Sequence, residues 1–185
     1  MDPYLRDDTK YTIEDVEKLP DGKRAELVDG EMYLMSTPSR KHQRVLGELY
    51  SAVSDYIKKK GGKCEVNFAP FAVYLFNDDY NYFEPDLTVV CDSEKLDDKG
   101  CHGAPDWVIE ITSPSTRQMD YMVKLFKYER AGVKEYWIVD VEKERVRVYD
   151  FYHSTTEDYN LNEIVKAGIY EDLEIDFSEI MKMVE

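Results

Sequence analysis

Two long stretches of the chain have the spacing of apolar residues that is typical of amphipathic helices. Apolar side chains recur every three or four positions from about 39 to 60 and from about 117 to 131, which places them on one helix face. A glycine follows each stretch, at Gly61 and Gly132, as is common at helix ends. Two shorter helices are predicted at about 12–19 and 177–184.

Shorter apolar runs bounded by turn residues predict β-strands. The clearest pair surrounds Asp29-Gly30, with about 24–28 before it and 31–35 after it, and this dipeptide is typical of tight hairpins. The other predicted strands cover about 64–69, 71–76, 82–90, 106–112, 135–141, 145–151 and 159–165.

The order of these elements predicts an α/β fold. A hairpin, a long helix and antiparallel strands come first, and one strand–helix–strand crossover follows, which indicates a mixed central β-sheet flanked by helices. The 185 residues contain no repeat and no Ser/Gly linker, so we expect one domain, 1–185. Apolar runs of five or six residues are far shorter than the roughly 20 that a membrane helix needs. Residues 1–8 lack the basic start and apolar segment of a signal peptide, so a cytoplasmic protein is expected.

The charge balance limits how the protein could meet nucleic acid. With 24 Lys and Arg against 39 Asp and Glu, the net charge is −15, which counts against non-specific binding to long nucleic acid but leaves room for a local basic groove. Arg40, Lys41 and Arg44 form the best local basic cluster. They could contact phosphates or simply form a solvated helix start.

The three cysteines show no paired spacing. An odd set, Cys64, Cys91 and Cys101, predicts reduced thiols in a reducing compartment. Zinc is not favoured at Cys91, Cys101 and His102, because no C-x-x-C partner accompanies them.

A carboxylate interrupts the most apolar strand. Glu110 lies within Trp107-Val-Ile-Glu-Ile, and a buried carboxylate must be paired with a cation, hydrogen-bonded or bound to metal. Alternation along a strand puts Glu110 and Thr112 on one face. The same alternation groups Glu84, Asp86 and Thr88 in the run 83–90. Two neighbouring strands would then bring acids together, as the oxygen ligands of a divalent cation require, although a buried Lys or Arg could equally be the partner.

One lysine could reach these acids from the following helix. Asp120, Lys124 and Lys127 share a narrow sector at 100° per residue. This sector is either a solvated stripe with an Asp120–Lys124 pair, or it carries Lys124 toward Glu110. A cation beside a metal-bound carboxylate pair can stabilise developing negative charge or hold an attacking water.

A longer string of motifs resembles a known family. Pro85-Asp86 followed by Glu110-x-Thr112 is similar to the PD…(D/E)-x-K signature of restriction-endonuclease-like nucleases. Around it stand Asp29-Gly-Glu, Pro38 with His42, Glu84-Pro-Asp, Pro105-Asp, Glu110-Ile-Thr-Ser-Pro-Ser-Thr, Asp120-x3-Lys124-x3-Tyr128-x2-Ala-Gly-Val and Glu135-Tyr-Trp-Ile-Val-Asp. This order and spacing over about 11–150 resemble the bacterial Uma-two family, a restriction endonuclease group formerly classed as a domain of unknown function.

The resemblance implies a restriction-endonuclease-like fold and Mg²⁺ (or Mn²⁺) as cofactor. Asp86 and Glu110 would be the metal ligands, with the backbone carbonyl of Ile111 as a third. Thr112 stands where the motif lysine is expected, so Lys124 becomes the catalytic candidate.

Two further residues match family positions, and each has a second interpretation. Glu31 is either an extra acid beside the metal or a polar residue of a hairpin strand. His42 is either part of the active site or a structural histidine at a helix start.

The leading hypothesis is a metal-dependent endonuclease that hydrolyses phosphodiester bonds in nucleic acid, with DNA favoured. A homodimer would suit the cutting of both strands of a duplex. Two alternatives stay open. One is a catalytically inactive binding or regulatory module, and the other is an enzyme of the same fold that acts on a small phosphorylated substrate.

Overall fold

A six-stranded mixed sheet forms the centre of the protein. The structure, a computed structural model, describes residues 10–184, so the signal-peptide expectation for residues 1–8 lies outside the described part. Strands β8 and β9 are parallel, and every other neighbouring pair is antiparallel. In sheet order the strands are β11 (Thr155–Asn160), β10 (Arg145–Asp150), β9 (Glu135–Asp140), β8 (Trp107–Thr112), β5 (Leu87–Val90) and β3 (Glu65–Phe68).

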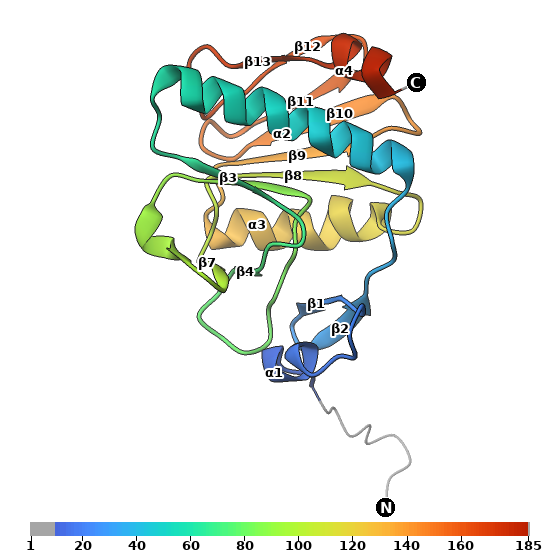
Figure 1. The fold of residues 1–185 in the computed structure, drawn as a ribbon, viewed down its shortest axis with the longest axis vertical. Coiled ribbons are helices and arrows are strands. Elements are labelled where there is room, and N and C mark those ends of the chain that lie inside the picture. Colours follow the sequence, from blue (N-terminus) through green and yellow to red (C-terminus); the bar gives the residue numbers. More distant parts are fainter. Residues whose placement is uncertain (1–9, 185) are drawn as a thin grey trace, which may run out of the picture.

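Helices cover both faces of this sheet (Figure 1). One face carries α2 (Arg40–Lys60) and α4 (Phe177–Val184). The other carries η2 (Met119–Lys124), a π-helical segment, which continues into α3 (Leu125–Ala131). Two short helices complete the set, α1 (Ile13–Glu17) and the 3₁₀ turn η1 (Ser93–Lys95). The predicted mixed sheet flanked by helices is therefore confirmed.

Alternation along β8 and β9 divides the core into two layers. The odd-numbered residues of β8, with Trp137 from β9, pack under α2 and α4. Val108 of β8 and Tyr136 of β9 pack under α3 with Tyr128. Both strands are buried along their whole length, so the face that holds Glu110 lies inside the protein.

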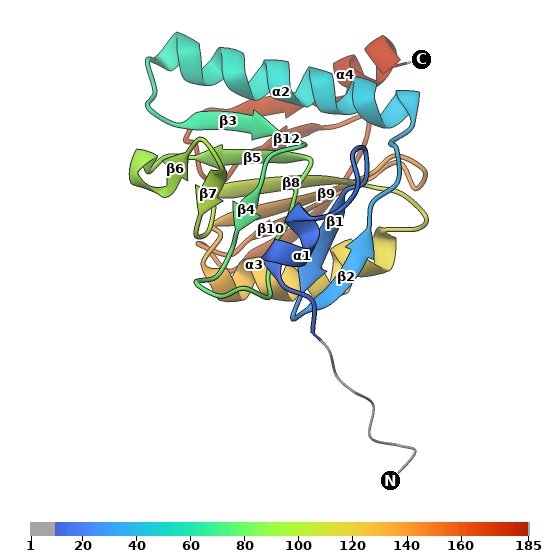
Figure 2. The ribbon, with the colours of Figure 1, turned by 60° about the horizontal axis from the view of Figure 1, so that its bottom comes forward.

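Three small sheets surround the central one. The β1–β2 hairpin turns at Asp29 and Gly30, which both have positive φ, 50° and 86°, as the predicted tight turn requires. A backbone bridge from Leu27 to Tyr82 attaches this hairpin to the segment that leads into β5, and Figure 2 shows it against the α3 side of the molecule. The small sheets comprise β1 (Ala25–Val28) with β2 (Glu31–Leu34), β4 (Val73–Tyr74) with β7 (Gly100–His102) and β6 (Leu96–Asp97), and β12 (Ile164–Lys166) with β13 (Glu174–Asp176).

Several strand boundaries differ from the prediction. The run 82–90 forms a strand only from Leu87, because Pro85 cannot donate to a ladder. The run 159–165 is divided between β11 and β12 by a turn. Backbone pairing of Gly100 and Cys101 with Asp97 and Leu96 creates β6 and β7 in a stretch predicted to be loop.

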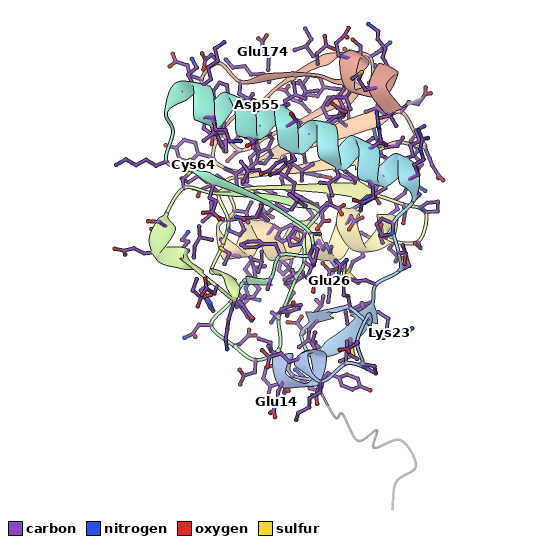
Figure 3. All side chains as sticks on the ribbon, viewed as in Figure 1. Glu14, Lys23, Glu26, Asp55, Cys64 and Glu174 are labelled. Atoms are coloured by element: carbon purple, nitrogen blue, oxygen red, sulfur yellow. A yellow bond between two sulfur atoms is a disulfide. The ribbon has the colours of Figure 1, made fainter. Side chains whose placement is uncertain are left out.

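The prediction of three reduced thiols is wrong. A disulfide joins Cys64 and Cys91, which directly flank the paired residues Glu65 and Val90 of β3 and β5. Figure 3 labels Cys64 near the C-terminal end of α2. A separation of 27 residues gives no indication of this pairing, because it depends on the strand register. Cys101 is a buried free cysteine. Because Cys91 belongs to the disulfide, these two residues cannot bind a zinc ion together. No helix within residues 10–184 is long and apolar enough to cross a membrane.

Thiol counting tests the disulfide. In denaturant without reductant, one thiol per chain should react with a chromogenic disulfide reagent, and three should react after reduction. Reaction should be slow in the folded protein, because burial raises the pKa of Cys101 to about 11. Closure of a loop between residues 27 apart should stabilise the oxidised form by about 3 kcal/mol in denaturant titrations. Three reactive thiols without reductant would contradict the assignment.

Candidate active site

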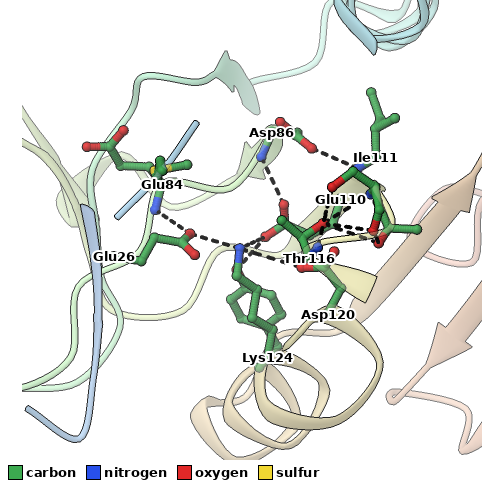
Figure 4. Close-up of polar contacts among 12 residues, drawn as sticks. Glu26, Glu84, Asp86, Glu110, Ile111, Thr116, Asp120 and Lys124 are labelled. Carbon is green, nitrogen blue, oxygen red and sulfur yellow. Dashed lines mark hydrogen bonds and ion pairs between the residues drawn. The ribbon is translucent and has the colours of Figure 1, made fainter. Parts of the chain in front are cut away.

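Glu110 and Lys124 pair on the α3 side of the sheet, and the backbone of Asp86 lies next to Glu110 (Figure 4). Asp86 lies directly before β5, and Glu110 belongs to the neighbouring strand β8. Lys124 is the last residue of η2, and its Nζ lies 2.8 Å from Oε1 of Glu110. The backbone N–H of Asp86 points to Oε2 of Glu110 at 3.4 Å. The crossover helix thus carries a lysine to the carboxylate of its preceding strand.

Two more carboxylates surround the same lysine. Nζ of Lys124 lies 2.8 Å from Oε1 of Glu26 in β1 and 3.8 Å from Oδ1 of Asp120. Asp120 and Lys124 are only 2% and 4% exposed, so the interpretation of this stripe as solvated is wrong. Burial of a lysine requires charged partners, and here three carboxylates supply them.

The electrostatics of the cluster follow from burial and proximity. Burial alone lowers the pKa of Lys124, but Glu110, Glu26 and Asp120 outweigh it and raise that pKa well above its ordinary value. Lys124 is therefore an ammonium group at neutral pH. Burial raises the pKa of Glu110, and Asp120, Asp86 and Glu26 add to the rise against the effect of Lys124. Burial likewise raises the pKa of Asp120. The site holds three carboxyl groups around a single lysine, so a second cation would stabilise their ionised forms.

His42 and Ile111 hold the carboxylate of Asp86. Oδ2 of Asp86 accepts the backbone N–H of Ile111 at 2.8 Å and lies 3.1 Å from Nε2 of His42. His42 occupies the first turn of α2, where Ser39 caps the helix by accepting its backbone N–H. Burial lowers the pKa of His42, but Asp86 and the backbone carbonyl of Ile111 outweigh it, so the net pKa is raised.

Thr112 occupies the position where the motif has a lysine, and its side chain contacts a neighbouring threonine. Its hydroxyl lies 3.3 Å from Oγ1 of Thr116, where the chain turns from β8 toward η2. Hydrogen bonds from Thr112 and Thr116 lower the pKa of Asp120 against its burial. The end of the strand thus orients Asp120, while the ammonium group comes from Lys124.

Comparison with known proteins places the chain in a family. The sequence model of the Uma2 family, described as "Putative restriction endonuclease", matches residues 13–176. The chain belongs to the Uma2 family. An uncharacterized protein from Synechocystis is 26% identical over 128 residues, which cover 69% of this chain. They span 66% of that protein, just under two thirds of its length.

A crystal structure shares the fold of this Uma2 protein. It comes from Anabaena variabilis and is described as that of "a putative nuclease belonging to DUF820". The two structures superpose with a TM-score of 0.76 over 94% of this chain and 99% of the other, at 21% identity. The family resemblance and the restriction-endonuclease-like α/β fold are thereby confirmed.

Other residues singled out in the Uma2 sequence lie outside the cluster. Glu31 is exposed and accepts a hydrogen bond from Tyr33 at 2.7 Å. The predicted grouping of Glu84 with Asp86 is wrong, because Pro85 ends the alternation and the Glu84 carboxylate pairs with Arg24 at 2.6 Å. In the basic cluster, Arg40 and Lys41 are exposed, and Arg44 donates to the backbone carbonyl of Met183.

Sequence reasoning missed Glu26 and Tyr128. The hydroxyl of Tyr128 donates to Oε1 of Glu110 at 2.9 Å, and both residues are buried. Glu26 interrupts the apolar run Ala25-Glu-Leu-Val as Glu110 interrupts its own strand. The rule that drew attention to Glu110 would also have found Glu26. Tyr128 stood in the quoted family motif but was given no role there.

Replacing the lysine tests the cluster. Lys124→Met should lower the free energy of unfolding by about 3–5 kcal/mol at neutral pH, because three buried carboxylates lose their cation. Lys127→Met is the matched control on the same helix. Lys127 is also buried, but the side chain of its partner Asp29 is 65% exposed. Its replacement leaves no buried carboxylate without a cation, so the loss should be about 1 kcal/mol or less. Urea titrations measure both values, and equal losses would contradict the assignment.

Proposed function

We propose that this Uma2 protein is a divalent-metal-dependent endonuclease that hydrolyses phosphodiester bonds in DNA. The observation that carries the proposal is the buried contact of Lys124 with Glu110, next to Asp86, in a family described as a restriction endonuclease group. In this proposal Asp86 and Glu110 provide a place for a metal, and the ammonium group of Lys124 beside Glu110 provides a cation for developing charge.

The residues present fit a divalent cation. Within residues 10–184, no hydrogen bond reaches Oδ1 of Asp86, and Oε2 of Glu110 accepts only the 3.4 Å contact from Asp86. Both oxygens are therefore available, and the carbonyl of Ile111 is the third proposed ligand. No cage of three His, Cys, Asp or Glu side chains is present among the described residues. Mg²⁺ usually takes only one or two protein carboxylates and keeps several waters, and the three carboxyl groups around one lysine favour Mg²⁺ or Mn²⁺.

When bound, the cation supplies Lewis-acid activation of the scissile phosphate and of the attacking water. Lys124 is placed to orient that water or to stabilise negative charge on the phosphate oxygens. In the reaction a water oxygen bonds to phosphorus and gives up a proton to solvent. The bond from phosphorus to the leaving sugar oxygen breaks, and that oxygen takes up a proton from solvent. Glu26 and Asp120 hold the ammonium group of Lys124 in place.

His42 acts in this proposal as a positioning residue. Its ring holds Oδ2 of Asp86, so the other carboxylate oxygen keeps a fixed direction toward the proposed metal. Glu31 lies outside the contact network, and the variant Glu31→Gln decides separately whether its carboxylate contributes.

Cleavage of DNA tests the proposal. Purified protein should nick or cut supercoiled plasmid in Mg²⁺ or Mn²⁺, and EDTA should abolish cutting. Asp86→Asn and Glu110→Gln should reduce the rate by about 10³-fold or more, because each removes a charge from the proposed metal ligands. Lys124→Met should lower the rate by about 10²-fold or more beyond any loss of folded protein.

The matched control is Glu129→Gln, the same substitution at an exposed position of α3, which should cut like the wild type. The proposal would be contradicted if the Glu110→Gln variant still cut DNA at the wild-type rate, or if Glu129→Gln lowered the cutting rate as much as Glu110→Gln does. Folded wild type that binds the metal and DNA but cuts no substrate would favour the alternative of a binding module.

A further inference from the structure

A basic groove lies on the outer side of η2, the side away from Lys124. It has a volume of about 390 Å³ and runs between η2 and the turn that joins β9 to β10. Gln118, Tyr121 and Met122 contribute its helical wall, while Asp120 and Lys124 of the same segment are buried against the sheet. The cations that line it are Arg117, Lys143, Arg145 and Arg147.

This concentration of positive charge is unusual in a chain with a net charge of −15. None of the described residues that line the groove is acidic. Within residues 10–184, three carboxylates contact its cations, namely Asp140, Glu142 and Asp158. Glu142 is exposed and its Oε2 lies 3.4 Å from Nη2 of Arg117. Asp140 is fully buried and holds Arg117 through two hydrogen bonds, at 2.7 and 3.0 Å. Asp158 pairs with Arg147 and lies 3.8 Å from Nε of Arg145.

The cations keep part of their binding capacity. Among residues 10–184, the ammonium group of Lys143 makes no ion pair, and the side chain is exposed. One carboxylate, Asp158, is shared by two arginines. Anionic oxygens could therefore bind here without breaking the existing pairs.

An aromatic side chain keeps the arginines in place. The guanidinium groups of Arg145 and Arg147 lie over the ring of Tyr121, at 5.5 and 6.0 Å from its centre. The Tyr121 hydroxyl also accepts a hydrogen bond from Arg145 at 3.2 Å. Cation–π contact fixes an arginine while its outer N–H groups stay available. A groove lined by four cations offers N–H donors to the phosphates of a DNA backbone.

The groove and the candidate active site lie on the two sides of one helix. Both belong to the end of the sheet where β8 and β9 finish, and Figure 1 shows η2 at this end, near the start of α2. Exposed residues 114–116 connect β8 to η2 between them. A strand with its scissile phosphate near Glu110 could pass these residues and reach Arg117.

We infer that this groove is a second contact site for the phosphodiester backbone of DNA, which holds the segment next to the cleaved bond. The inference rests on the proposed function and adds to it the place where the substrate is held. It also explains how an acidic protein binds a polyanion. Among the described residues, the groove lining contains four cations and no carboxylate, on one side of the helical segment that carries Lys124.

Fluorescence anisotropy with a labelled duplex DNA tests the inference in EDTA, where no cleavage occurs. The variant Lys143→Ala/Arg145→Ala/Arg147→Ala should weaken binding about tenfold or more at low salt. It should also reduce the slope of log K against log salt by about 0.9 for each phosphate that the variant no longer neutralises. If this variant folds poorly by circular dichroism, Lys143→Glu changes one exposed side chain, and it should weaken binding by about threefold or more.

The matched control is Lys58→Ala/Lys59→Ala/Lys63→Ala, which removes the same charge from exposed residues at the other end of α2. It should bind within about twofold of the wild type. Wild type that does not bind duplex DNA, groove variants that bind normally, or an equal loss of affinity in the control would each overturn the inference.

These outcomes separate the two proposals. Binding through the groove without any cleavage would refute the nuclease and leave the groove assignment standing. If a groove variant binds DNA with the wild-type affinity and cleaves it at the wild-type rate, the groove assignment is refuted and the nuclease proposal stands.

Discussion

The burial of Lys124 among three carboxylates is the constraint on which the rest of the site depends. An ammonium group in a protein interior is strongly unfavourable without partners, and its partners come from separate parts of the chain. Glu26 belongs to the hairpin, Glu110 to the central sheet, and Asp120 to the crossover helix. The lysine therefore couples the position of the hairpin to that of the helix. A cluster of this kind costs stability compared with an apolar core, so its presence favours a chemical role.

The π-helical segment determines how the lysine reaches the sheet. Lys124 is its last residue, and the regular helix α3 begins directly after it. Such segments are rare and occur often at functional sites. Here one side of the segment presents Asp120 and Lys124 to the sheet, while its other side presents Tyr121 to the basic groove. One short irregular element thus serves both the proposed chemistry and the proposed binding of substrate.

Much of this arrangement could be predicted from local rules. Alternation along β8 placed Glu110 on one face of a buried strand, and helical spacing offered Lys124 as a partner for it, with a solvated stripe as the alternative. The same rules could not give the Cys64–Cys91 disulfide, which depends on the register of β3 and β5. They also could not give the groove, because Arg117 and Arg145 are distant in sequence and meet only when the turn after β9 folds beside η2. Glu26 was within reach of the rule that found Glu110, but its strand belongs to a hairpin whose position only the tertiary structure reveals.

The central claim is that Asp86 and Glu110 form a divalent-metal site beside a fixed lysine. Calorimetric titration of Mn²⁺ into the wild type and into Glu110→Gln tests it most directly, because metal binding needs neither the right DNA nor a complete reaction. The account predicts saturable binding of Mn²⁺ by the wild type and no saturable binding by the variant. Equal binding by both proteins, or no binding by the wild type at millimolar metal, would contradict it.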